Sequence, residues 1–172
     1  MNLITNRTQA DVDRVRELAA KAKAGTWSAQ EQAEWLAGMR GAYNYTDWNR
    51  VEAAVAELAT MLGVQVSTVT TWGARAIPTV ADSARYLSNI RKLRTVCQGL
   101  TNTPATPESM QRMTFRTAND IEKILTDLET VAYGELIAFN LLYGGAAHMS
   151  QVLDELGIVL PFLATAALHI AI

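Results

Sequence analysis

Cysteine and histidine are scarce in this sequence. Its 172 residues include one cysteine, Cys97, and two histidines, His148 and His169. A single thiol can form neither an intramolecular disulfide nor a thiolate cage, and two histidines are too few for a histidine-rich metal site. We therefore expect no metal and no cofactor, and we expect Cys97 to be a small core residue on a helix.

Motifs for catalysis are absent as well. The chain contains no G-x-x-x-x-G-K phosphate loop, no dinucleotide-binding fingerprint and no H-E-x-x-H sequence. His148, Ser150 and Asp154 have the residue types of a hydrolase triad. However, His148 and Ser150 lie two apart, and on a helix they would point to different sides. We expect no catalytic residues and no enzyme activity.

Positive charge is missing from the last part of the chain. Residues 1–100 carry 12 basic and 9 acidic side chains, residues 101–172 carry 3 and 8, and no Lys or Arg follows Lys123. The net charge of −2 argues against a dedicated nucleic-acid-binding protein. The asymmetry has two interpretations, a subunit that stacks head to tail or simply solvated helix faces.

A signal peptide is not evident, because residues 1–7 lack the basic and then apolar order of such a segment. We expect the protein to stay in a reducing cytoplasm. Residues 156–172 carry no charged side chain, but Gly157, Pro161 and His169 and the missing basic anchor argue against a membrane span. This tail is interpreted as buried in a core or against a neighbouring subunit, with a membrane-active segment or an exposed end as alternatives.

Signals for helix starts, in contrast, are frequent. A Ser or Thr stands three residues before an acidic residue at four places, and apolar residues follow at helical spacing. The four pairs are Thr8 with Asp11, Ser28 with Glu31, Thr79 with Asp82, and Thr117 with Asp120. The second of these helices is expected to carry Trp35, Leu36 and Met39 toward Gly41. The sequence predicts an all-α protein, a multi-helix bundle.

A further helix is expected from Thr46 to Gly63, because Val51, Val55, Leu58 and Leu62 recur at spacings of four, three and four. Tyr45 and Arg50 have the spacing of a hydrophobic staple around a Thr46 cap. The helix after Thr79 has an apolar stripe of Val80, Ala84, Leu87, Ile90, Leu93 and Cys97. Its basic residues Arg85, Arg91, Lys92 and Arg94 are read as a solvated face, with a phosphate patch as the alternative.

The last predicted helix runs from about Thr117 to Tyr143, with Ile121, Leu125, Leu128, Ala132, Leu136 and Phe139 on one stripe. Its length makes it the expected spine of the bundle. We therefore expect a helical domain over residues 1–143 and a separate apolar segment over 144–172.

Two segments between helices are candidates for contacts with other proteins. Tyr43, Tyr45 and Trp48 place aromatic area in one turn, which suits a packing corner or a docking site. Residues 64–72 change to alternating β-branched residues, which predicts a short extended segment that is either a connection or a strand paired between subunits. The interface candidates are Tyr43, Tyr45, Trp48, Val66, Trp72, Ile158, Leu160, Phe162 and Leu163.

Several segments resemble a family of small structural proteins from prophage modules of Gram-positive gut bacteria. They are NRTQADV (6–12), EQAEWLAGM (31–39), GAYNYTDWNRVEAAVAELA (41–59), WGARAIPTVADSARYLSNIRKLR (72–94) and ANDIEKIL (118–125). The resemblance covers about residues 3–142. It implies a helical component of a siphophage tail or baseplate, made in the host bacterial cytoplasm and present in the virion, without catalytic residues. The expected partners are further copies of itself and other phage structural proteins, with no nucleic acid. The alternative is a phage-encoded effector that binds a host protein.

Overall fold

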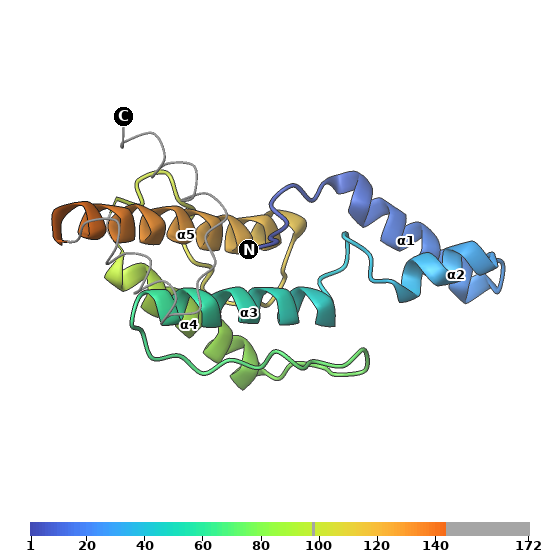
Figure 1. Ribbon diagram of the computed structural model, residues 1–172. Helices are drawn as coiled ribbons and strands as arrows, with labels where there is room; N and C mark the ends of the chain where they lie inside the picture. Colours follow the sequence, from blue (N-terminus) through green and yellow to red (C-terminus); the bar gives the residue numbers. More distant parts are fainter. Residues whose placement is uncertain (98, 144–172) are drawn as a thin grey trace, which may run out of the picture. The chain divides into compact units, whose positions relative to one another are not determined.

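The computed structural model describes residues 1–97 and 99–143, and this part of the chain contains five helices and no strand (Figure 1). The predicted all-α class is therefore confirmed. The helices are α1 (Gln9–Ala24), α2 (Ala29–Leu36), α3 (Tyr45–Met61), α4 (Val80–Val96) and α5 (Phe115–Tyr143).

Three of the four predicted capping boxes are present. Thr8, Ser28 and Thr79 accept a hydrogen bond from the backbone of the third helical residue, whose carboxylate accepts one from the cap. The box predicted at Thr117 is wrong. Helix α5 begins two residues earlier because the Thr114 hydroxyl accepts from the Thr117 amide at 3.2 Å. The capping-box pattern thus located the start of this helix but placed its cap at Thr117, three residues after the actual cap, Thr114.

The predicted start of α3 is also wrong. Asn44 is the cap, since its side-chain oxygen accepts from the Thr46 amide at 2.9 Å and the Asp47 carboxylate accepts from the Asn44 amide at 2.9 Å. With Asn44 as the cap, Tyr45 is the first residue of the helix and no longer precedes the cap, so Tyr45 and Arg50 do not have the spacing of a staple. Helix α2 ends at Leu36, so Met39 is buried in the following turn and not on that helix.

The core of the first compact unit, residues 1–132, lies between α3, α4 and the first part of α5. Its fully buried members include Leu58, Ile90 and Leu128. Two members of the predicted α4 stripe are wrong, because Val80 and Ala84 are exposed. Tyr86 and Asn89 are buried in their place, so the buried face of α4 is rotated from the predicted one.

The role of α5 as a bundle spine is not confirmed. The chain divides into compact units of residues 1–132 and 133–172, and this boundary falls inside the helix. The expected division at 143/144 stays a prediction, and the segment 144–172 lies outside the described residues.

The connection between α3 and α4 runs back along α3. Its contacts with that helix step toward the helix start, from Val64 on Ala59 to Val69 on Glu52 and Trp72 on Asn49 (Figure 1). Residues 64–72 form neither helix nor strand. Within the described chain they are an irregular connection, and pairing with another subunit stays a prediction.

One close approach joins α1 to the turn before α3. A Cβ atom added to Gly41 would lie 2.1 Å from the Asp11 carbonyl oxygen and 2.6 Å from the Val12 nitrogen. Both are backbone atoms of α1, which cannot move aside as the tip of a flexible side chain would. Glycine at position 41 thus sets the distance between α1 and this turn.

Candidate functional site

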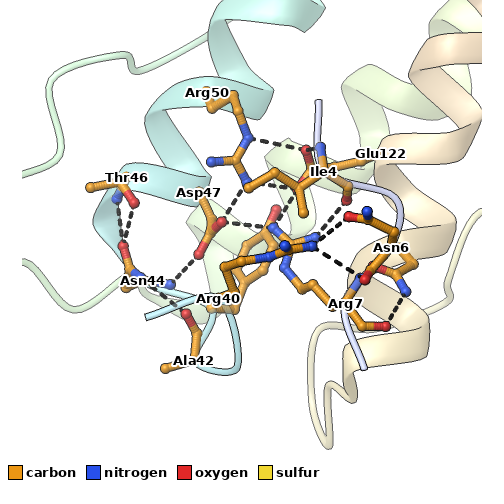
Figure 2. Close-up of polar contacts among 12 residues, drawn as sticks. Ile4, Asn6, Arg7, Arg40, Ala42, Asn44, Thr46, Asp47, Arg50 and Glu122 are labelled. Carbon is orange, nitrogen blue, oxygen red and sulfur yellow. Dashed lines mark hydrogen bonds and ion pairs between the residues drawn. The ribbon is translucent and has the colours of Figure 1, made fainter. Parts of the chain in front are cut away.

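A buried cluster of four charged side chains connects the N-terminal segment to α3 and α5 (Figure 2). Nη2 of Arg7 lies 2.7 Å from Oδ1 of Asp47 and 2.6 Å from Oε1 of Glu122. Arg50 binds the same two carboxylates, with its Nε 3.1 Å and its Nη2 2.8 Å from Glu122. Two guanidinium groups therefore face two carboxylates in a place that water barely reaches.

Backbone groups of the N-terminal segment complete this cluster. The Ile4 amide donates to Glu122 at 2.5 Å and the Arg7 amide donates to Asn119 at 2.9 Å. Nη1 of Arg7 donates to the Ile4 carbonyl at 2.7 Å. A buried ion pair is costly unless such bonds satisfy its remaining atoms, and here most are satisfied. The cluster is an anchor, because both carboxylates are occupied and neither is free to act as a base.

A third buried carboxylate, that of Glu52, holds the α3–α4 connection. The Glu52 carboxylate accepts hydrogen bonds from both Nη atoms of Arg85 at 2.6 Å and from the Val69 amide at 2.9 Å. Ser67 adds its carbonyl as an acceptor for Arg85 and for Asn89, both at 2.7 Å. This bidentate pair neutralises the Glu52 charge and also fixes the orientation of the Arg85 guanidinium.

The basic side chains of α4 bind loop carbonyls. Arg91 donates to the Pro107 carbonyl, Arg94 to the Pro104 carbonyl and Lys92 to the Gln65 carbonyl. These contacts fit neither a phosphate patch nor a face that only meets water. They fasten the connections on both sides of α4 to the helix.

The predicted aromatic corner is a packed cluster of rings. The Trp48 ring centroid lies 4.6 Å from that of Tyr86, 5.4 Å from that of Trp72 and 6.3 Å from that of Tyr43. Trp48 is only 7% exposed. The guanidinium carbon of Arg7 lies 5.7 Å from the Tyr43 ring centroid, so the aromatic cluster borders the charged one. The structure therefore places Trp48 in the core.

The other interface candidates occupy three kinds of position. Val66 and Trp72 are partly buried and pack against the core. Tyr45 is partly buried and lines a shallow hollow together with Trp35 and Leu36. Ile158, Leu160, Phe162 and Leu163 lie outside the described residues. The interface candidates therefore do not form one surface among the described residues, and their role in contacts between molecules stays a prediction.

Sequence reasoning missed the ion pair between Arg7 and Glu122 and the buried position of Tyr86. Arg7 and Glu122 lie 115 residues apart and show no local pattern that pairs them. Tyr86 was hidden because it is not on the predicted apolar stripe of α4. A weak signal existed for Glu122, since it stands three residues before Leu125 and so next to the predicted apolar stripe of the helix.

The three most exposed large apolar side chains of the described residues, Leu36, Ile77 and Val80, belong to two surfaces. The first, the α2 patch, consists of Trp35 and Leu36, and Leu36 is 77% exposed. The second, the α4 patch, consists of Ile77 and Val80, which are 88% and 78% exposed. Neither surface was among the predicted interface residues. Both lie next to shallow hollows in the protein surface.

Other site types were searched for in the same residues. Among residues 1–97 and 99–143, no set of three or more His, Cys, Asp or Glu side chains is arranged to hold a metal ion. Within those ranges no helix is sufficiently long and apolar to cross a bilayer. In comparisons with known proteins, no family model, curated protein or solved structure matches this chain.

The buried pair of Tyr43 and Tyr86 leads us to predict how the stability of the protein changes at alkaline pH. The hydroxyl groups of Tyr43 and Tyr86 are hydrogen-bonded to each other, and burial raises the pKa of both phenols. The unfolded chain then loses these protons first, so stability present below about pH 10 decreases as the pH rises further. Ultraviolet titration should show two of the five tyrosines ionising only as the chain unfolds.

The matched variant is Tyr43→Phe/Tyr86→Phe, which removes both hydroxyl groups and so leaves neither without a partner. We expect its loss of stability above about pH 10 to be smaller than that of the wild type. If all five tyrosines titrate together in the folded wild type, the paired, buried state of these phenols is wrong.

Proposed function

We propose that this chain is a structural subunit of a phage tail or baseplate, acting through protein–protein contacts and self-assembly. The proposal is supported by the sequence resemblance over residues 3–142 and by one structural observation, the exposure of Leu36, Ile77 and Val80. Covering these side chains with a partner would remove apolar surface from water, which favours association. The proposed occupant is a second copy of this chain.

The arrangement of these patches suits repeated assembly. The α2 patch and the α4 patch are different surfaces of one molecule, and two different surfaces that meet give a head-to-tail contact. Such contacts form rings or filaments, which is the geometry a tail component needs. The net charge is +3 in residues 1–100 and −5 in residues 101–172, and attraction between opposite charges on two copies favours the same head-to-tail contact.

The test is the native mass of the purified chain by light scattering, with and without residues 157–172. We expect a defined multimer for the full chain and a smaller species for Leu36→Ser/Ile77→Ser. The matched control is Val96→Ser, which removes an apolar side chain that is also exposed but belongs to neither patch. If truncation alone gives monomer, the tail is the assembly element.

A monodisperse monomer in every form would contradict self-assembly. That outcome would favour the second candidate, a phage-encoded effector that binds a host protein. An unchanged multimer in Leu36→Ser/Ile77→Ser would show that self-assembly uses a different surface, and the two patches would lose their proposed role.

A further inference from the structure

A cleft of about 410 Å³ lies between α1, the turn after α2 and the start of α5. Four arginines line it, namely Arg7, Arg16, Arg40 and Arg116, and no carboxylate is among its described lining residues. This volume falls within the range of small-molecule sites in proteins. A concave surface with one sign of charge concentrates ligands of the opposite sign.

Carboxylates outside the lining neutralise two of these arginines. Arg7 faces Asp47 and Glu122, and Arg16 lies 3.1 Å from Asp13. Arg40 and Arg116, in contrast, form no ion pair within the described residues, although Arg40 lies near enough to the Asp11 carboxylate to lower its pKa. The excess positive charge of the cleft therefore comes from these two side chains and is partly offset by Asp11.

Both remaining guanidinium groups keep donors for a ligand. Nη2 of Arg40 donates to the carbonyl and side-chain oxygens of Asn6, while its Nε and Nη1 have no acceptor in the described chain. Arg116 rests over the Phe115 ring at 5.7 Å from the centroid and makes no other described contact. A guanidinium carries five N–H donors, so each of these two can bind an oxyanion through two of them.

The start of α5 adds backbone donors to the same cleft. Thr114 satisfies the Thr117 amide through its hydroxyl and the Ala118 amide through its carbonyl at 3.0 Å. The amides of Phe115 and Arg116 find no acceptor in the described chain. Free amides at a helix start, together with the helix dipole, favour an anion.

Arg7, which also lines the cleft, has one buried donor without a partner. Its side chain is 2% exposed, and its Nε has no hydrogen-bond partner in the described chain. Buried donors are nearly always paired. Because this nitrogen is buried, it is not counted among the donors that the cleft offers to a ligand.

We propose that this cleft binds a phosphate monoester that carries an apolar or aromatic group. Two unpaired guanidinium groups and two free amides match the charge and the several oxygens of a phosphate dianion better than the single charge of a carboxylate. Val12, Met113 and Phe115 line the remaining wall and suit the apolar part. The site goes beyond the proposed assembly role and uses none of its patches.

The test uses the full chain with phenyl phosphate as the probe and inorganic phosphate, phenyl sulfate and benzyl alcohol for comparison. We expect saturable binding of phenyl phosphate by calorimetry and shifted amide resonances at Phe115 and Arg116. Arg40→Gln and Arg116→Gln should each weaken binding about tenfold, since each removes one charge-assisted contact. Arg75→Gln, an exposed arginine outside the cleft, should bind as the wild type does.

The pH supplies a second readout that needs no variant. The second phosphate proton has a pKa of about 6, so binding should weaken between about pH 7 and pH 5. The proposal would be overturned if Arg75→Gln weakened phenyl phosphate binding as much as Arg40→Gln and Arg116→Gln do. It would also be overturned if benzyl alcohol bound more tightly than phenyl phosphate, or if phenyl phosphate binding did not saturate. Tighter binding of a single-stranded oligonucleotide that is insensitive to Arg40 and Arg116 would also overturn it, since it would show unspecific attraction.

Discussion

Replacing Glu122 with glutamine is expected to lower the free energy of unfolding by about 3 kcal/mol, the usual cost of breaking a buried ion pair. Glu122 is fully buried and accepts from Arg7, Arg50 and the Ile4 amide. Glutamine keeps the shape but removes the charge, so two buried guanidinium groups are left with the single carboxylate of Asp47. Urea unfolding monitored by circular dichroism measures the loss.

A double-mutant cycle separates charge from shape. Arg7→Met removes the excess positive charge that Glu122→Gln creates, and the pair formed by Asp47 and Arg50 remains. The double variant should therefore be more stable than the sum of the two single losses implies, by about 2 kcal/mol. The control Glu108→Gln removes an exposed carboxylate without a described partner and should change stability by less than about 0.5 kcal/mol. Additive losses would contradict the coupled cluster.

Replacing Gly41 with alanine is expected to lower the free energy of unfolding by about 2–3 kcal/mol, at the upper end of the cost of overpacking. The new methyl carbon would lie 2.1 Å from the Asp11 carbonyl oxygen, well inside contact distance. Because the obstacle is helix backbone, α1 must shift as a body. Urea unfolding gives the magnitude, and faster amide exchange in α1 would locate the change.

Gly73→Ala is the matched control for this variant. A Cβ atom at Gly73 would meet nothing within 4 Å. The same chemical change there should be neutral or slightly stabilising, by less than about 1 kcal/mol. Equal losses at the two positions would show that backbone entropy, and not the contact with α1, explains the effect at Gly41.

The sequence predicted what depends on neighbours along the chain. The boxes at Thr8, Ser28 and Thr79 were found because cap and partner are three residues apart, and the spacing of Val51, Val55 and Leu58 revealed the buried face of α3. The cap at Asn44 was missed because Thr46, two residues later, is also a residue type that commonly caps helices. Local rules decide which helices exist better than they decide where each begins.

Contacts between distant residues could not be predicted in this way. Nothing near Arg7 shows that a carboxylate 115 residues later will bind it, and no spacing rule joins Trp48 to Tyr86. The aromatic turn was therefore open to two interpretations, and burial of Trp48 in the core supports packing. The exposed patches were missed because a local pattern was present but misleading. Leu36 and Val80 look like core residues when only periodicity is considered.

The bonds that hold the N-terminal segment have a consequence for synthesis on the ribosome. Met1, Ile4 and Arg7 find their partners 112 to 128 residues later, at Asn119, Glu122 and Glu129. These contacts close the largest loops in the first compact unit, and such closures slow folding. While the nascent chain is short, Arg7 has no Glu122 to bind. The unit can therefore reach its native state only after nearly all of it has been translated, so a ribosome pause before α5 would prolong the life of an incomplete fold.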